Sequence, residues 1–347
     1  FFFGLAMPPI PWASWIAEPP PPPPPPPPER FPLKAAALVV VMGGIGAYGA
    51  WLLYQNRGNE AGPGLIGQAA DLIRQKAVKR PRAVPKECLP DIEDLSPCEH
   101  GFDRPMQGDF AEIHGAMKSI DQHLLISTPH HPTTWAADPV QSSELLAAMS
   151  AGLSVFPKAE RPACHMYYEP DPDADDSTTT LLWYPKRVQL TGVSLDSVAE
   201  VLTCILTGTV EGLPEGVRCS PITGTQVFIC AHKQRDGRCG YCGPVLAAEF
   251  EKQLPKWKNL SHRVQVRKVC HVGGHKYAGN VLVYGEGLLD WYAYVRPEDV
   301  PELIEKAIVA GQWVPRIWRG RVGLSEEETE RMRQQCLSAR PRTLRVI

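Results

Sequence analysis

The fold is decided by residues 226–254, which run QVFICAHKQRDGRCGYCGPVLAAEFEKQL. The apolar run at the start ends at Cys230 and predicts a short buried strand. The apolar spacing at the end predicts a helix over Pro244–Leu254, because proline is tolerated in a first turn. Between them lies a polar, glycine-containing segment that carries Cys239 and Cys242, and we expect it to form a loop. A strand, a cysteine loop and a helix therefore follow one another directly.

The rest of the chain continues this mixture of strands and helices. Strands are predicted at His123–Thr128, Met166–Tyr168, Leu181–Tyr184, Val264–Cys270, Val281–Tyr284 and Asp290–Val295. Helices are predicted at Ser143–Ala151, Ser194–Thr207 and Pro301–Ala310. No internal sequence repeat is evident. Close alternation of this kind predicts an α/β, thioredoxin-like layered fold.

Composition limits the classes of function. The chain has 347 residues, enough for about two domains, and its net charge of −2 argues against a nucleic-acid partner. Ten cysteines in a chain this long do not form a disulfide-dense scaffold. Three of them fall within residues 230–242, which favours metal or redox chemistry.

The N-terminal quarter predicts a membrane anchor. Residues 1–34 form an arm that contains ten consecutive prolines, Pro19–Pro28, and should adopt polyproline II. Ala35–Tyr54 has no charged residue over twenty positions, which predicts a single transmembrane helix and the lipid bilayer as a partner. Residues 55–87 form a basic linker with helical spacing over 64–78. By the positive-inside rule, we expect a single-pass protein of an organellar membrane, the mitochondrial inner membrane, with its C-terminal part in the matrix.

Four side chains form the candidate metal site: Cys230, Cys239, His271 and His275. Two thiolates and two imidazoles can hold a zinc ion or ligate a two-iron cluster. The two glycines between the histidines allow the positive φ angles of a tight loop. On spacing alone, zinc, an iron–sulfur cluster and no metal all remain open.

Other residues near this group have alternative interpretations. Cys239 and Cys242 form a C-x-x-C pair that could act as a dithiol, but we interpret Cys242 as a spare thiol. Cys88 and Cys98, with His100, could form a second site. His232 could form a hydrogen bond behind the metal ligands, but we interpret it as a solvated loop residue. The residues interpreted as packing the end of the chain across the fold are Trp313, Trp318, Arg319 and Arg321.

Three motifs in order, VFICAHKQRDGRCGYCGP, HVGGHKYAGNVLVY and WRGRVGLSEEE, resemble the sucrase/ferredoxin-like family over about residues 88–330. The resemblance implies a two-part thioredoxin-like ferredoxin fold, with an N-terminal subdomain at 88–212, a cluster domain at 213–330 and a tail at 331–347. It also implies a 2Fe–2S cofactor held by Cys230, Cys239, His271 and His275. Mixed ligation of this kind raises the reduction potential and can couple it to pH.

These features together predict an accessory subunit of a large organellar membrane complex, with a mitochondrial respiratory complex preferred. Its partners would be the other subunits, and its task electron transfer rather than independent catalysis. Two alternatives stand beside this prediction: a free-standing tethered redox protein, and a structural scaffold that holds zinc.

Overall fold

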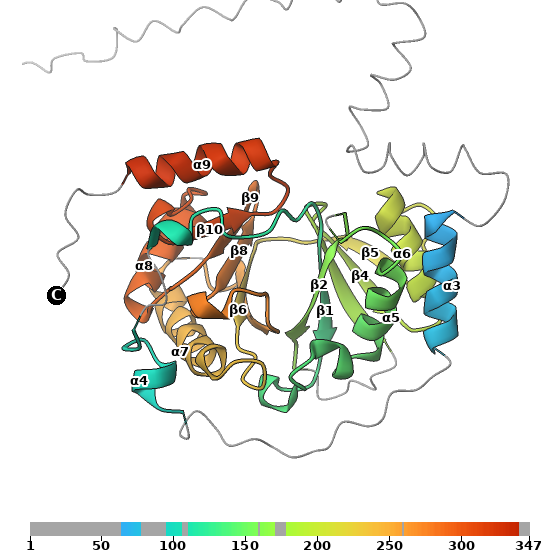
Figure 1. Ribbon diagram of the computed structural model, residues 1–347, viewed down its shortest axis with the longest axis horizontal. Helices are drawn as coiled ribbons and strands as arrows, with labels where there is room; N and C mark the ends of the chain where they lie inside the picture. The colour runs from blue at the N-terminus through green and yellow to red at the C-terminus, as the bar shows by residue number, and fades with distance from the viewer. Residues whose placement is uncertain are drawn as a thin grey trace, which may run out of the picture. The chain divides into compact units, whose positions relative to one another are not determined.

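The computed structural model describes residues 64–77, 95–105, 110–158, 160–170, 178–258 and 260–339. In these residues the strands form one mixed sheet of ten, in the order β10-β9-β8-β6-β7-β2-β1-β3-β4-β5 (Figure 1). The N-terminal unit, residues 123–221, contains β1 (His123–Thr128), α5 (Glu144–Leu153), β2 (Ala163–Tyr168), β3 (Thr179–Tyr184), β4 (Val188–Val193), α6 (Val198–Thr207) and β5 (Arg218–Pro221). The C-terminal unit, residues 225–321, contains β6 (Thr225–Cys230), α7 (Gly237–Gln253), β7 (Val264–Val269), β8 (Val281–Gly285), β9 (Leu288–Tyr292), α8 (Val300–Glu302) with the π-helix Leu303–Val309, and β10 (Trp318–Arg321).

The two units share one topology. In each, a helix joins two parallel strands, β1 to β2 and β6 to β7. Each first strand also pairs antiparallel with the third strand, which continues as an antiparallel pair with the fourth. A helix and a fifth antiparallel strand then complete each unit. The chain therefore repeats its topology although its sequence shows no repeat.

The helices lie on the outer faces of the sheet. Leu124 and Ile126 of β1 pack with α5 and α6, and Val227 and Ile229 of β6 pack with α7 and the helix after β9. Figure 1 shows α7 and α8 outside one half and α5 and α6 outside the other. Side chains alternate along a strand, so the next residues, Leu125 and Phe228, point to the opposite, helix-free face.

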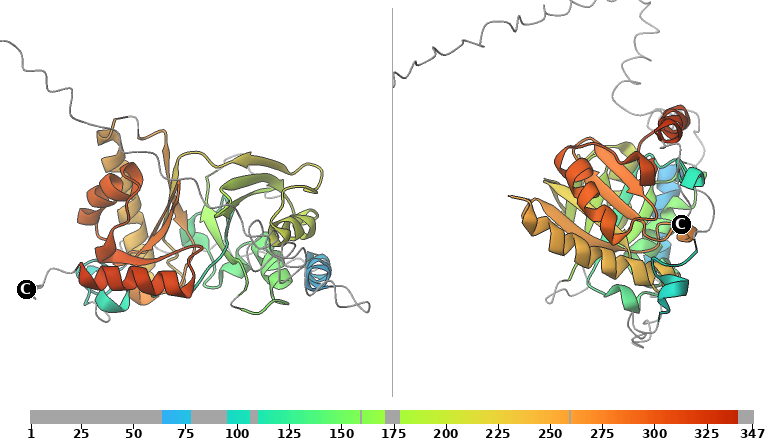
Figure 2. Two further views of the ribbon diagram at one scale, coloured as in Figure 1. Left: turned by 90° about the horizontal axis from the view of Figure 1, so that it is seen from above. Right: turned by 90° about the vertical axis from the view of Figure 1, so that its left-hand side faces the viewer.

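The helix-free faces of the two units pack against each other, as the view from above in Figure 2 shows. The units join edge to edge where β2 pairs antiparallel with β7. His123 on β1 and Tyr284 on β8 are four strands apart in the sheet order, about 19 Å if the sheet were flat. Their side chains nevertheless form a 2.6 Å hydrogen bond. The sheet therefore curls and encloses a shared interior.

Three further helices flank the units. They are α3 (Leu65–Ala77), α4 (Pro97–His100) and α9 (Glu326–Ser338). Ala69, Ala70 and Ile73 of α3 are buried in the same core cluster as residues of α5 and α6. The amphipathic spacing predicted over 64–78 thus forms a helix that packs on its own chain.

The prediction of a membrane anchor is corrected. None of the helices in the described residues is long and apolar enough to cross a bilayer. The longest, α7, has 17 residues and includes four charged ones, Arg238, Glu249, Glu251 and Lys252. The single spanning helix, the lipid bilayer as a partner and the single-pass arrangement are therefore not supported. Ala35–Tyr54 and the proline-rich arm at 1–34 lie outside the described residues.

Candidate metal centre

Three of the four predicted ligands meet at one point. Cys230 ends β6, Cys239 lies in the first turn of α7, and His271 follows β7. The sulfur atoms of the two cysteines and a ring nitrogen of His271 all lie within 4.8 Å of one another. Both cysteines are buried, and His271 is half-buried. The fourth, His275, opens the 3-10 turn His275–Tyr277, but its side chain lies outside the described residues.

The loop predicted around Cys239 is wrong, because α7 begins at Gly237 instead of Pro244. Asp236 caps the helix by accepting a 3.0 Å hydrogen bond from the backbone N–H of Arg238. Glycine here serves close packing, since a Cβ on Gly243 would lie 2.5 Å from the carbonyl oxygen of Cys230. The close contact between helix and strand is what brings Cys239 to Cys230.

The histidine loop follows its prediction more closely. Gly273 and Gly274 have φ angles of +78° and +66°, the left-handed region that glycine adopts without strain. The loop then closes through a 2.9 Å hydrogen bond from the Tyr277 N–H to the Gly274 carbonyl. This turn directs the chain back into β8 after it has presented His271.

The pKa values of the two cysteines are shifted in opposite directions in the protein alone. A hydrogen bond from Cys239, together with the nearby His271, lowers the pKa of Cys230 well below its usual value. The same contact, with burial, raises the pKa of Cys239 well above its usual value. Two cysteine sulfurs and an imidazole at this spacing are a donor set for zinc or for iron in a cluster. The residues therefore fit such a group, and binding would release the Cys239 proton.

His232 is buried and does not match its prediction as a solvated residue. Its Nε2 donates a 2.8 Å hydrogen bond to the carbonyl of Ala136 in the N-terminal unit. Its Nδ1 accepts a 3.4 Å hydrogen bond from the backbone N–H of His271. His232 thus ties the His271 backbone to the opposite unit. Only its position two residues after Cys230 could have suggested this role from sequence.

The other candidate residues do not join the metal site. The Cys242 sulfur accepts a 3.3 Å hydrogen bond from Nη1 of Arg104, and Cys239 and Cys242 are both free thiols. Cys98 is exposed, and Cys88 lies outside the described residues. Across the described ranges, Cys230, Cys239 and His271 form the one group with the spacing of metal ligands.

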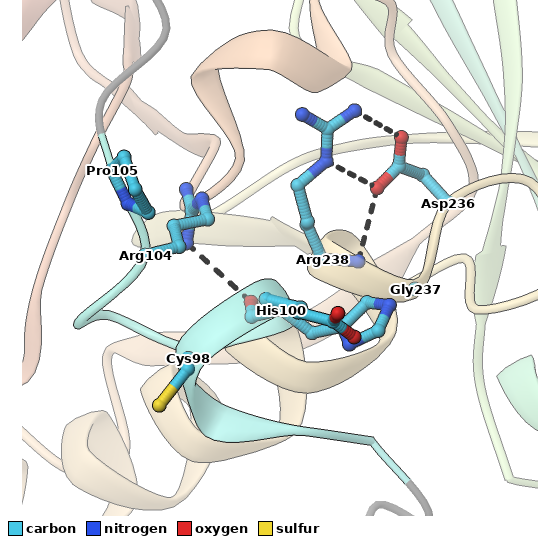
Figure 3. Close-up of a pocket in the computed structure, with 8 residues that line it drawn as sticks. Cys98, His100, Arg104, Pro105, Asp236, Gly237 and Arg238 are labelled. Atoms are coloured by element: carbon cyan, nitrogen blue, oxygen red, sulfur yellow. Dashed lines mark hydrogen bonds and ion pairs between the residues drawn. The ribbon is translucent and has the colours of Figure 1, made fainter.

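A pocket of about 510 Å³ lies beside the start of α7, lined by Cys98, Glu99, His100, Arg104, Pro105, Asp236, Gly237 and Arg238. Figure 3 shows Arg238 facing Asp236, with 2.8 Å between the charged groups, while the Cys98 thiol points away from them. None of the three ligand candidates lines this pocket. The metal centre is therefore a buried site apart from this surface hollow.

The C-terminal unit has the strand order and crossover helix of a thioredoxin-like protein, with a buried Cys/Cys/His site at the start of that helix. The sequence profile of the sucrase/ferredoxin-like family matches residues 113–320, which is more than half of the chain. The chain belongs to this family.

Relatives match a shorter part of the chain. "Altered inheritance of mitochondria protein 32" of Meyerozyma guilliermondii is 42% identical over 104 residues, which are 29% of this chain and 36% of the relative. "Actin patches distal protein 1" of Saccharomyces cerevisiae is 40% identical over 92 residues, 24% of this chain and 29% of the relative. The match thus spans about a third of the length of these relatives.

A solved thioredoxin-like [2Fe-2S] ferredoxin from Aquifex aeolicus also aligns with the chain. Its identity is 22%, its TM-score is 0.26, and the alignment covers 28% of this chain and 93% of the ferredoxin. The fold assignment rests on the strand order above and not on this alignment.

Proposed function

We propose that this protein is a mitochondrial redox protein that binds a 2Fe–2S cluster in its C-terminal unit and transfers single electrons. The observation that carries the proposal is the buried group of Cys230, Cys239 and His271, with ligand atoms within 4.8 Å of one another. Membership of the sucrase/ferredoxin-like family supports the cofactor. The organelle is inferred from the mitochondrial name of the relatives.

Four residues would hold the cluster: Cys230, Cys239, His271 and, from the same loop, His275. A cluster with two cysteine and two histidine ligands accepts one electron at a higher potential than an all-cysteine cluster. The protein fixes the two sulfur donors on rigid elements, the end of β6 and the first turn of α7. His232 orients the histidine loop against the N-terminal unit, and the packed interior between the units excludes water.

The exposed edge of the site indicates where an electron partner would dock. Cys230 and Cys239 are almost completely buried, at 1% and 0% exposure, whereas His271 is half-buried. Electron transfer depends on a short distance between the centre and the surface. A partner would therefore approach over His271 and the loop that carries it.

The direct test is metal and sulfide analysis of the full chain, with electron paramagnetic resonance spectra before and after dithionite. We expect two irons, two labile sulfides and a signal that appears on reduction. Cys239→Ser should abolish the cluster, whereas Cys242→Ser, one helical turn further along α7, should keep it. Zinc without iron, or no metal at all, would instead identify a structural scaffold.

The narrower prediction, an accessory subunit of a respiratory complex, is not part of this proposal. It rested on the N-terminal arm and the predicted span, which lie outside the described residues. It stays a prediction.

A further inference from the structure

Arg319 is a buried cation surrounded by neutral partners. Its residue is 5% exposed, and within the described ranges no carboxylate forms an ion pair with it. Nη1 donates to the carbonyl of Gly273 at 3.1 Å and to Oδ1 of Asn280 at 2.9 Å. Nε is buried and has no hydrogen-bond partner among the described residues. The guanidinium also lies over the rings of Tyr277 and Trp291, at 5.8 and 5.4 Å.

This cation lies beside the metal centre. It comes from β10 and supports the loop between His271 and β8, where a Cβ on Gly274 would lie 2.4 Å from its Nη2. Burial lowers the pKa of Arg319 to about 10, and Cys230, Tyr277 and Cys239 act in the opposite direction. The side chain is therefore charged at neutral pH and lies within electrostatic range of both sulfur ligands.

A buried charge without a counter-charge is costly, so its presence needs a compensating group. The chain offers a clear contrast two residues later. Arg321 binds both oxygens of the buried carboxylate of Asp290, at 2.7 and 2.9 Å. At Arg319 the corresponding acceptor is the neutral amide of Asn280, and in the described residues no carboxylate compensates the positive charge. The compensating negative charge must then come from the cysteine site and from what it binds.

We propose that Arg319 sets the reduction potential of the metal centre by stabilising the reduced state. This inference rests on the proposed cluster. One-electron reduction, by dithionite in the laboratory or by a one-electron donor protein, adds one negative charge to the site. A fixed cation nearby favours that state over the oxidised one and raises the potential. Arg319 is a positioning residue that acts on the site through its charge and through its hydrogen bond to the Gly273 carbonyl.

The sharpest test neutralises the charge without removing the side chain. Asn280→Asp keeps the shape of the acceptor and places a carboxylate 2.9 Å from the guanidinium, by analogy with the existing contact. We expect the equilibrium constant for reduction to fall at least about tenfold, which is about 59 mV for a one-electron couple. Arg319→Gln should lower it similarly, whereas Arg319→Lys should remain near the wild type. Arg333→Gln, on exposed α9 and paired with Glu330, is the matched control and should not change the potential.

A second readout uses the protein without cluster. In the apoprotein the new carboxylate supplies the missing counter-charge, so Asn280→Asp should raise the thermal midpoint of unfolding. The same substitution should raise the midpoint of the cluster-bound protein by less. The inference is wrong if Asn280→Asp and Arg319→Gln both bind a cluster and the equilibrium constant for its reduction stays within about twofold of the wild-type value. Absence of iron and sulfide from the wild-type protein would instead overturn the proposed function itself. If Arg319→Gln does not fold, Arg319→Met takes its place, because only a variant without the guanidinium charge separates the effect of Arg319 from that of the new carboxylate.

Discussion

The N-terminal and C-terminal units follow the same order of strands and helices, yet among the residues that the structure describes only the second carries the metal-ligand group. The last residue of β6 is Cys230, and the last residue of β1 is Thr128. After β7 the chain continues with Cys270 and His271, and after β2 it continues with Glu169 and Pro170. The same topology therefore occurs once with metal-ligand candidates and once without them among the described residues. The residues at the strand ends make this difference.

The N-terminal unit contributes as a cover. Ala136 anchors His232, and His123 with Tyr284 links the two helix-free faces. His123 also forms a 2.8 Å hydrogen bond to His165, whose pKa is lowered by burial and, next, by His271. The N-terminal unit thus packs against the unit that carries the described ligand group. The comparison predicts that changes at equivalent places in the two units will have very different effects.

The largest effect is expected at the strand ends. Cys230→Ser should abolish cluster binding, because serine oxygen is a poor replacement for a thiolate on iron. Cys164→Ser, on β2 of the other unit, should leave iron and sulfide content unchanged. Both variants are compared by metal analysis and absorbance of the purified full chain. Full iron content in Cys230→Ser would show that the ligand set is wrongly assigned.

The next effect concerns the histidine loop, which the N-terminal unit lacks. His271→Cys should keep a cluster but lower its potential by roughly 100 mV or more, since thiolate is negative where imidazole is neutral. The reduction potential of the wild type should decrease as the pH rises from about 6 to 10, because a ligating imidazole can lose its second proton on oxidation. The potential of the variant should depend less steeply on pH. Redox titration at several pH values measures both. A wild-type potential that is flat with pH would contradict mixed ligation.

A smaller effect is expected where α7 meets β6. Gly243→Ala places a Cβ 2.5 Å from the Cys230 carbonyl, so the helix must move and separate the two cysteines. We expect a loss of about 2–3 kcal/mol in the free energy of unfolding, with lower cluster occupancy. Gly285→Ala is the matched control, because its nearest neighbour would be Thr225 Oγ1 at 3.5 Å. Equal behaviour of the two variants in denaturant titrations would rule out the packing explanation.

The smallest effect tests the interface between the units through pH. Burial lowers the pKa of His123 well below 6.5 and the pKa of His165 to about 4. The unfolded chain therefore binds more protons, and stability should fall as pH decreases from about 6.5 towards 4. From His165 we expect roughly 1–2 kcal/mol, allowing for its partial exposure. His165→Gln should flatten this dependence, whereas exposed His262→Gln should leave it unchanged; no difference between them would remove His165 as the cause.

The sequence predicted local elements better than their assembly. The strand predicted at His123–Thr128 has those bounds, because an apolar run between turn residues specifies a buried strand. The start of α7 was missed by seven residues, since its glycines serve packing against β6 and not flexibility. Topological repetition left no sequence signal, because different apolar residues can fill equivalent positions.

The site was predicted in part for similar reasons. The spacing of soft ligands identified Cys230, Cys239 and His271, which the structure brings together. The supporting residues were interpreted too simply: His232 as solvated and Arg319 as packing. His232 contacts the N-terminal unit, and Arg319 contacts the histidine loop from β10. Neither contact follows from sequence spacing.

The central claim is that the C-terminal unit holds a 2Fe–2S cluster through both sulfur and nitrogen donors. It is tested most directly by pulsed electron paramagnetic resonance of the dithionite-reduced full chain, which detects nitrogen nuclei bound to the iron. We predict strong nitrogen couplings of imidazole type that change in His271→Cys. A reduced cluster without strongly coupled nitrogen, or no paramagnetic cluster in iron-replete protein, would contradict the account.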